Sequence, residues 1–529
     1  MKFEDYFQRE MLALRQLARE ALARNPALEP FLGTPGRDPD IERVLESFAF
    51  LAARLGQKVD DDLPEITHDL FSRLWPNYLR PFPAASVIQY QLTGDLSGNN
   101  GIPKGTLVES AEVEGIRCRF QTIYDVDLLP LRVVDQRLIE RGGTVIMAVR
   151  FALTGVNLQN FQISHLRIFF TGEESIPHTL YVTLTHHLKE LRFVIRDVGE
   201  DGESREHVTA VLRPSCVKPL GFQEDEGMLP YPENLAVGYR VLQEYFCYPE
   251  KFLFVEIADL QCGLSQDTRQ RFQHINEFEL HFVLEHLPEN HQSFRAANWK
   301  LFCTPVINIF PFMATPQTIA KNSTKHKIIP DPQQPDLYSV YSVEGVNNWG
   351  DSGKGGGTFE HLETINAFEH RRTNAPLRYR VQTIPTLNQE AVETYIIFDH
   401  IPHDGLTLDM ALLCTNGDLP TRLGLGDIGV AAESAEAATT ASCKNILPVS
   451  SPVSPPHADS ILWQLLSNMS LNTIPLTDVA AFRAMIAPYA FRARHDSGEA
   501  QALKKHLQSI QAIKSRSTDR IFRGVPKRG

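Results

Sequence analysis

The stretch Leu220–Ile257, which reads LGFQEDEGMLPYPENLAVGYRVLQEYFCYPEKFLFVEI, decides how the rest of the chain can fold. Its first third is acidic and rich in turn-forming glycine and proline. From Tyr239 to Phe246 apolar residues recur at helical spacing, Pro249 then stops the helix, and Phe252–Ile257 alternates as a strand does. Because aromatic side chains bury large areas, this helix and strand are expected in a core or at an interface. Nothing in the stretch indicates catalytic chemistry.

The bulk composition bounds the function. A chain of 529 residues is too long for one core, so roughly three domains are expected. The net charge of −12 argues against general nucleic-acid binding, which needs a basic surface. The opening residues MKFEDYFQRE lack the apolar run of a secretory signal, and no apolar run approaches the roughly 18 residues of a membrane helix. We therefore expect a cytoplasmic protein, without membrane insertion, whose partners are other proteins.

Cysteine and histidine form no recognisable metal or disulfide pattern. The seven cysteines are scattered without a CxxC pair, which indicates buried thiols in a reducing compartment. The 18 histidines are dispersed and include no HExxH. His186 and His187 are adjacent, so on a strand they would face opposite ways, and His400-Ile-Pro-His403 is read as a turn. No metal site and no cofactor are predicted.

Residues 1–82 are predicted to form a helical segment. Phe7, Met11 and Leu14 begin an apolar stripe at three- and four-residue steps. A second helix is expected over residues 41–55, and a third from Pro64 to Trp75, with proline at a permitted first-turn position. These helices either make a small bundle or each offer one apolar stripe to a partner. Phe7, Met11 and Leu14 are the interface candidates.

From Ser86 the apolar period changes to two, which predicts a β-rich domain over residues 83–335 that includes the central stretch. Short strands with polar turns and no helical crossovers favour antiparallel sheets, in a sandwich. The expected strands include Val145–Leu153, Leu166–Phe170, Leu180–Leu184, Leu191–Ile195 and Phe278–Leu284. The apolar run Trp299–Phe312 is cut by two prolines and an asparagine, so it is expected to be an irregular buried crossing.

Residues 336–529 are predicted to form a second β-rich domain with flexible loops and C-terminal helices. Its expected strands are Leu337–Val343, Leu377–Val381, Tyr395–Phe398 and Leu406–Leu412. A glycine-rich loop over 347–358 and a low-complexity loop over 424–460 are expected to be flexible. Helices are expected over Ile461–Leu471, Asp478–Ile486 and Gly498–Ile513. The fold class is therefore α+β, helical at the start, mainly antiparallel β later, and helical again near the C-terminus.

Three short strings imitate catalytic motifs. Gly424-Leu-Gly426-Asp-Ile-Gly429 fits the dinucleotide fingerprint but follows no strand and precedes low-complexity sequence. Ser352, in a GDSG string, resembles a serine-protease nucleophile without a matching histidine, and Gly353-Lys-Gly is an incomplete phosphate loop. We interpret all three as loops and predict no catalytic residues. The rival hypotheses kept open are a serine hydrolase that uses Ser352 and a secreted β-sandwich effector.

An ordered set of strings runs through most of the chain. It comprises MKFEDYFQREMLALRQLARE, DPDIERVLESFAFLAARLGQKVDDDLPEITHDLFSRLWPNYLRPFP, GYRVLQEYFCYPEKFLFVEI, CTPVINIFP, IIPDPQQPDLYSVYSVEGV, LLCTNGDLP and LWQLLSNMSLN. In these strings the sequence resembles the TssF (ImpG, VasA) family, a baseplate wedge subunit of the bacterial type VI secretion system. Family members typically continue beyond the position of RIFRGVPKRG into a further β-containing segment, whereas the sequence ends at Gly529.

The resemblance implies a structural subunit and not an enzyme. In this family two TssF copies join one TssG to form the wedge core. TssE links that core to the contractile sheath, and TssK links it to the membrane complex. Six such wedges surround the VgrG spike, in an arrangement similar to contractile phage baseplates. The implied location is the cytoplasm, at the inner face of the membrane complex.

Overall fold

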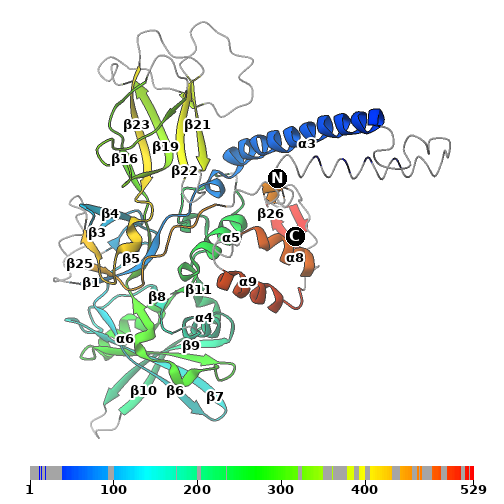
Figure 1. Cartoon of the computed structure of the whole chain (residues 1–529). Helices are drawn as coiled ribbons and strands as arrows, with labels where there is room; N and C mark the ends of the chain where they lie inside the picture. The colour runs from blue at the N-terminus through cyan, green and yellow to red at the C-terminus, as the bar shows by residue number, and fades with distance from the viewer. Residues whose placement is uncertain are drawn as a thin grey trace. The chain divides into compact units, whose positions relative to one another are not determined.

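The structure is a computed structural model, which describes these residues: 7, 11, 14, 18, 39–92, 101–173, 175–198, 204–233, 235–319, 325–348, 360–361, 378–385, 392–398, 406–431, 441–455, 462–463, 465–466, 479–489, 497–513, 519–522 and 525–528. The chain divides into two compact units, Met1–Leu79 with Pro456–Pro475, and Arg80–Pro455 with Leu476–Gly529. Among the described strands every pairing is antiparallel except that of β20 (Glu360–His361) with β21 (Arg378–Pro385). The predicted α+β class is confirmed (Figure 1).

The central stretch folds as a helix followed by a strand. Helix α5 spans Val237–Cys247, a 3-10 turn spans Pro249–Phe252, and β12 spans Phe254–Ile257. The strand therefore begins two residues later than predicted, because Pro249 opens a 3-10 turn instead of leading directly into the strand. Strand β12 pairs with β11 (Val217–Pro219) and β8 (Leu166–Phe170), and β14 (Trp299–Leu301) completes this four-stranded sheet.

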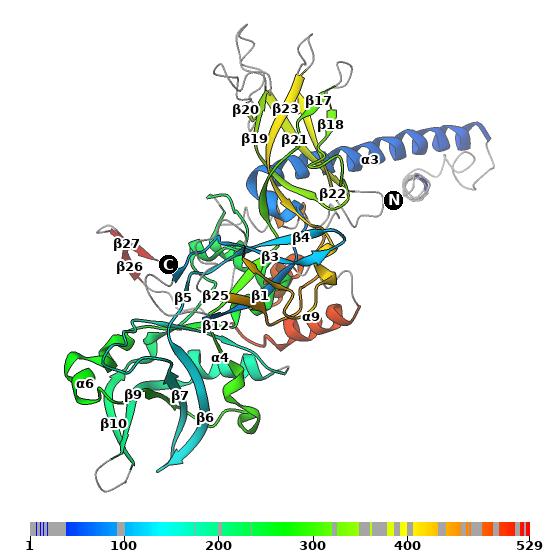
Figure 2. The ribbon, with the colours of Figure 1, turned by 90° about the vertical axis from the view of Figure 1, so that its left-hand side faces the viewer.

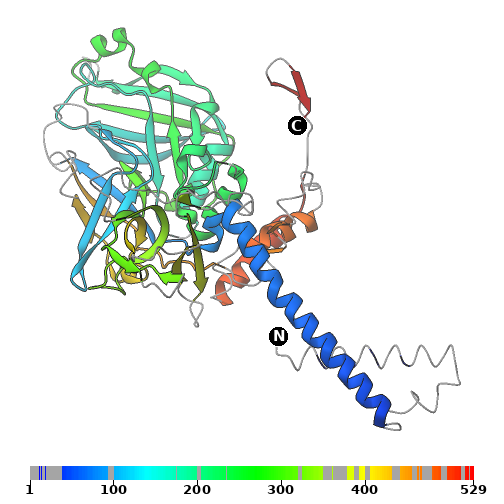
Figure 3. The same ribbon diagram turned by 90° about the horizontal axis from the view of Figure 1, so that it is seen from above.

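The N-terminal unit contains one long helix where the sequence predicted two. Helix α3 spans Pro39–Leu74, 36 residues, and Figure 3 shows it as a single ribbon. Pro64 lies inside it and not at its first turn, so one backbone hydrogen bond is lost while the flanking turns continue. At its end three buried rings pack together. The centroid of the Tyr78 ring lies 5.7 Å from that of Phe71 and 5.1 Å from that of Trp75. This aromatic cluster anchors the end of α3 to the 3-10 turn Pro76–Leu79.

A six-stranded sheet joins distant parts of the chain in the order β24-β3-β4-β15-β1-β25. Its strands are β1 (Ala85–Leu92), β3 (Leu107–Val113), β4 (Ile116–Thr122), β15 (Cys303–Ile307), β24 (Ile428–Ala431) and β25 (Ala441–Asn445). Strands β24 and β25 lie in the segment that was expected to be a flexible loop. That prediction was wrong for them, because Ile428 and Ala441 bury their side chains in this core despite the alanine-rich sequence between the strands.

A five-stranded sheet has the order β10-β9-β13-β7-β6, and Figure 2 shows its strands together with α4. The strands are β6 (Leu131–Arg141), β7 (Thr144–Leu153), β9 (Leu188–Val198), β10 (Ser204–Leu212) and β13 (Glu277–Leu284). One face carries a core of stacked rings, with Phe278 4.7 Å from Phe193 and 5.3 Å from Phe151 between centroids. Short helix α6 (Gln266–Arg271) lies between the strand β12 and β13 segments.

The run Leu180–Leu184, predicted as a strand, belongs instead to helix α4 (Ile176–His186). Pro177 sits in the first turn of this helix, where its missing N–H has no intrahelical partner to lose. Leu180 and Leu184 are buried four residues apart on one helical face. The apparent alternation of this run reflected one helical stripe read over too short a window.

Two further sheets pack on a common core. One contains β16 (Phe310–Met313), β17 (Gln317–Ile319), β19 (Ser339–Asn348) and β23 (Leu406–Thr415); the other contains β18 (Lys325–Lys327), β20, β21 and β22 (Val392–Phe398). Buried Leu408, Met410 and Leu412 from β23 meet Ile396 and Phe398 from β22. The predicted strands of this region are confirmed. Residues 349–359, which include most of the expected glycine-rich loop, lie outside the described residues.

The run Trp299–Phe312 is buried as predicted but is not irregular. It supplies β14, β15 and β16 in succession, one to each of three different sheets. Phe302, at φ 59°, redirects the chain between β14 and β15. Pro305 lies opposite Val87 inside the six-stranded sheet.

The C-terminal part contains α8 (Val479–Ile486) and α9 (Ser497–Ser509), close to the predicted helices. Near the C-terminus, β26 (Asp519–Phe522) and β27 (Val525–Arg528) pair antiparallel. Of the first predicted C-terminal helix, Leu462, Trp463, Leu465 and Leu466 are described and are helical.

Candidate functional site

The interface candidates Phe7, Met11 and Leu14 are all helical and half-buried, as is Ala18. Steps of four, three and four residues place these side chains on one stripe of a helix. The predicted stripe is therefore present as a local structure. Its use at an interface stays a prediction.

Helix α3 turns large apolar side chains outward. Val44, Phe48 and Leu51 lie on one face and are 67 %, 60 % and 65 % exposed, whereas Ala49 and Ala53 on the opposite side are fully buried. Neighbouring exposed apolar side chains of this size mark interaction surfaces more often than scattered single ones do. Of the two readings left open by the sequence, this arrangement favours a stripe offered to a partner.

The helix of the central stretch buries polar side chains, whereas its apolar residues at helical spacing, Tyr239, Leu242 and Phe246, are half-buried. Its buried side chains are Arg240, Gln243, Glu244 and Cys247, whereas the aromatic residue Tyr245 is 44 % exposed. The apolar spacing placed the stretch in a core or at an interface and gave no indication of these buried polar side chains. A buried polar face needs partners, since an unpaired charge in the interior is costly.

Those partners come from within the same stretch. Glu244 and Lys251 are both fully buried and form an ion pair. The second carboxylate oxygen of Glu244 accepts a hydrogen bond from the Met228 N–H at 2.7 Å, and the Arg240 guanidinium lies 3.2 Å from the oxygen that Lys251 contacts. Burial lowers the pKa of Lys251, and the neighbouring Glu244 carboxylate opposes that shift. Glu244 therefore holds two cations and one backbone amide at a single buried point.

A second carboxylate organises the acidic turn at the start of the stretch. Glu226 Oε2 accepts the N–H groups of Gly221 at 2.7 Å and Gln223 at 2.9 Å. Arg240 donates to the Gln223 carbonyl at 2.7 Å and so ties this turn to α5. Gly221, at φ +102°, leaves room for the Phe252 ring, which a Cβ would approach to 2.9 Å. Only glycine fits both the backbone angle and this contact.

The resulting cluster is charge-balanced, with Glu226 and Glu244 against Arg240 and Lys251. The Tyr124 hydroxyl donates to the Lys251 carbonyl at 3.3 Å. Burial raises the pKa of Tyr124 well above its usual range, and the two carboxylates add to that shift. We name these residues the central ion cluster: Tyr124, Glu226, Arg240, Glu244 and Lys251. It is a structural centre, because Arg240 and Lys251 both pair with Glu244, and Glu226 accepts two backbone N–H groups of the acidic turn.

Aromatic side chains of the same stretch divide between core and surface. Tyr248 and Phe252 are buried, whereas Tyr245 and Phe222 are 44 % and 42 % exposed. The Tyr245 and Phe222 rings lie 5.8 Å and 5.3 Å from the Phe252 ring. The stretch was expected in a core or at an interface, and its rings are divided accordingly: Tyr245 is exposed and Phe246 is half-buried.

The five-stranded sheet contains a separate buried carboxylate. Glu279 is buried and accepts two hydrogen bonds from Arg137, at 2.8 Å and 3.0 Å, and pairs with His281 at 2.7 Å. Arg196 Nε lies 3.1 Å away as an ion pair. Burial alone would raise the Glu279 pKa, but the His281 hydrogen bond and the two guanidinium groups outweigh it and hold the pKa below its usual range.

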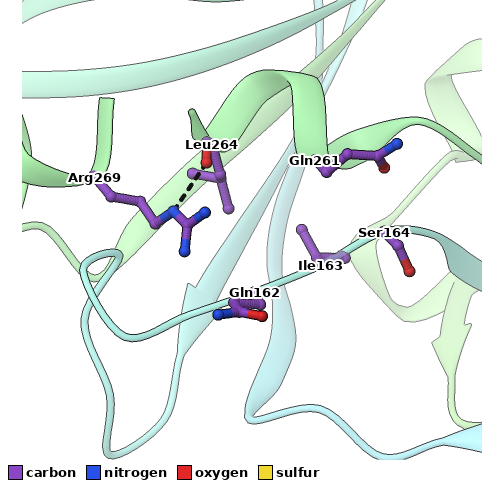
Figure 4. Close-up of a pocket in the computed structure, with 6 residues that line it drawn as sticks. All are labelled: Gln162, Ile163, Ser164, Gln261, Leu264 and Arg269. Atoms are coloured by element: carbon purple, nitrogen blue, oxygen red, sulfur yellow. Dashed lines mark hydrogen bonds between the residues drawn. The ribbon is translucent and has the colours of Figure 1, made fainter. Parts of the chain in front are cut away.

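A cavity of about 240 Å³ beside α6 is lined by Gln162, Ile163, Ser164, Gln261, Leu264 and Arg269 (Figure 4). Arg269 Nε donates to the Leu264 carbonyl at 2.9 Å, so that guanidinium is engaged in holding the turn. Ser164 Oγ lies 3.0 Å from His165 Nδ1, and His165 Nε2 lies 2.9 Å from Asp127. His165 directly precedes β8, and its contact with the exposed Asp127 therefore holds the start of β8 beside residue 127.

The strings that imitate catalytic motifs have local structures of their own. In Gly424-Leu-Gly426-Asp-Ile-Gly429 a turn leads into strand β24 and not into the helix that a dinucleotide fingerprint requires. A Cβ on Gly429 would lie 2.6 Å from the Cys443 carbonyl oxygen, so this glycine permits close strand packing. Ser352, the Gly353-Lys-Gly string and His400-Ile-Pro-His403 lie outside the described residues.

Comparison with known proteins decides the family. A family model described as "Type VI secretion system, TssF" matches residues 1–529. The chain belongs to the TssF family. A curated TssF relative, the type VI secretion system component TssF1 of Pseudomonas aeruginosa, is 26 % identical over 562 residues, which cover 98 % of this chain and 87 % of the relative.

Two solved structures of type VI secretion assemblies contain chains with a similar fold. In the TssK-TssF-TssG baseplate subcomplex of the type VI secretion system, one chain matches with a TM-score of 0.68 and 25 % identity, over 92 % of this chain and 88 % of that one. A chain of the type VI baseplate complex matches with a TM-score of 0.54 and 23 % identity, over 99 % of this chain and 88 % of that one, and shows the fold alone.

This TssF-family chain is a structural subunit of the type VI secretion baseplate. The family predicted from the ordered strings is confirmed. In the described part of the chain, no helix is both long enough and apolar enough to cross a membrane.

Proposed function

We propose that this chain is a wedge subunit that assembles with TssG and TssK, and through them with a second TssF copy, TssE and the VgrG spike. The observation that carries the proposal is the match over 92 % of the chain to a structure in which TssF is assembled with TssK and TssG. The proposed location is the cytoplasm, where the baseplate docks at the inner face of the membrane complex. The protein acts by holding partners and not by catalysis.

The proposed assembly element is the N-terminal segment, residues 1–82. Two stripes support it: Phe7, Met11 and Leu14 on the first helix, and exposed Val44, Phe48 and Leu51 on α3. Helices in water are stabilised mainly by packing of an apolar face, so partner helices would complete the exposed stripe of α3 and the half-buried stripe of the first helix. The predicted division into segments 83–335 and 336–529 stays a prediction, and the six-stranded sheet takes strands from both segments.

Co-expression with TssG tests the assembly proposal. The variant Leu14→Asp places a charge in the apolar stripe and is expected to abolish co-purification, because an unpaired carboxylate would have to be buried on binding. Arg43→Asp is the matched control, since Arg43 is exposed and pairs only with Asp40 at 3.9 Å. Hydrogen exchange of the β sheets should be the same in both variants.

If the Leu14→Asp variant still co-purifies with TssG, the first helix packs only within its own chain and does not bind TssG. A parallel Phe48→Asp variant asks the same question of α3, whose stripe is exposed. If neither variant weakens co-purification, the N-terminal segment is not the assembly element.

A further inference from the structure

We propose that His187, Glu285 and His286 form a surface binding site for a divalent transition-metal ion of the zinc type. These three are the one group among the described residues whose imidazole and carboxylate ligand atoms all lie within 4.8 Å of one another. Sequence spacing does not indicate this site, because His187 is distant in sequence from Glu285 and His286. The site is independent of the assembly function proposed above.

The backbone brings the three residues together through two buried leucines. His187 follows α4 and precedes β9, and Glu285 follows β13 directly. Leu188 and Leu284 are paired between these strands and are both buried. The Glu285 N–H donates to the His187 carbonyl at 2.9 Å. The two segments therefore meet at a fixed separation, while the ligand side chains point away from the core.

The side chains already approach one another. The rings of His187 and His286 lie 4.3 Å apart between centroids, and His187 Nδ1 lies 3.7 Å from a Glu285 carboxylate oxygen. Ligand atoms around a tetrahedral zinc ion, with bonds of about 2.0–2.2 Å, are separated by about 3.4 Å. Because Glu285 and His286 are exposed, small rotations of their side chains suffice to reach that spacing.

Charge and ligand type favour a zinc-like ion. Two neutral imidazoles and one carboxylate suit Zn²⁺, Cu²⁺ or Ni²⁺ better than Ca²⁺ or Mg²⁺, which prefer oxygen ligands. The carboxyl-terminal end of the 11-residue helix α4 adjoins His187, and the negative end of a helix dipole favours a cation. The fourth position is left to water.

The test uses the full chain, without a histidine tag, in a Cys262→Ser background, because Cys262 is an exposed free thiol. Zinc bound at equilibrium is measured by dialysis for the parent, for His187→Ala, Glu285→Gln and His286→Ala, and for the control His274→Ala. His274 is exposed and pairs with Asp197 at 3.5 Å, away from the group of three. Circular dichroism confirms that each variant is folded.

We expect one zinc ion per chain whose affinity falls at least about tenfold in each of the three site variants, as losses of even outer ligand partners do, and is unchanged in His274→Ala. Cobalt substituted at the site should give the visible absorption of a tetrahedral nitrogen and oxygen ligand set, lost in His286→Ala. Zinc binding that is the same in all variants, or no stoichiometric zinc in the parent, would overturn the proposal.

Discussion

Glu244→Gln should open the centre of the fold more than any single change of similar size. Glutamine keeps the shape of the side chain but removes the charge that two buried cations, Arg240 and Lys251, share. Glu226 would then be the one carboxylate of the central ion cluster left to balance the charges of Arg240 and Lys251. Breaking a buried ion pair from one side costs about 3–5 kcal/mol, a large part of the roughly 5–15 kcal/mol that holds a domain folded.

Hydrogen exchange of the α5 amides measures this cost locally, which is preferable in a chain with several cores. Since about 1.4 kcal/mol is tenfold in an equilibrium constant, a loss of 3 kcal/mol lowers protection about 100-fold or more. Glu224→Gln is the control, because Glu224 is an exposed member of the same acidic turn. Adding Lys251→Met to Glu244→Gln should recover part of the protection, because it removes one unpaired cation. Protection within about threefold of the parent in Glu244→Gln would refute the reasoning.

Three further outcomes are expected. Phe246→Ala should lower stability by less than the about 3–5 kcal/mol of a fully buried aromatic, because Phe246 is half-buried; insoluble protein would show that the ring is part of the core. The pKa of Glu279 is lowered in the folded chain, so ionised Glu279 stabilises its sheet at pH values above its usual pKa of 4.5. This contribution is lost as the pH falls through the folded-state pKa. Glu279→Gln should therefore lower the neutral-pH melting temperature and flatten the acid limb of the stability curve; an unchanged acid limb would count against it. Ser352→Ala and Ser164→Ala should leave secretion intact, and loss of secretion with normal assembly would support a hydrolase.

The sequence predicted elements well where the apolar period was long and unbroken. Strands such as β7 and β13 extend over eight or more residues, and the alternating apolar residues of β13 are buried as expected, although the polar residues between them, Glu279 and His281, are buried as well. Helix α4 was misread because five residues from Leu180 to Leu184 fit either period. Strands β24 and β25 were missed because the alanine-rich sequence between them indicated a flexible loop. Each strand buries an apolar side chain in the core of the six-stranded sheet, whose other strands are distant in sequence.

The central ion cluster was outside the reach of sequence periodicity. A pattern of apolar residues assigns the apolar face of α5 inward, and the sequence does not show that Glu244 will meet Lys251 seven residues later. Such pairs depend on the turn at Pro249, which returns the chain toward the helix. The group His187, Glu285 and His286 was missed for the same reason, since its members meet only through the pairing of β9 and β13.

The mass of the complex formed when this chain is co-expressed with TssG is the most direct test of the central claim. A wedge subunit should co-purify with TssG as one stable species that contains two copies of this chain for each TssG. The chain alone should be less soluble, because the stripes on its first helix and on α3 would lack partners. A monodisperse chain that is stable alone and does not bind TssG would contradict the account.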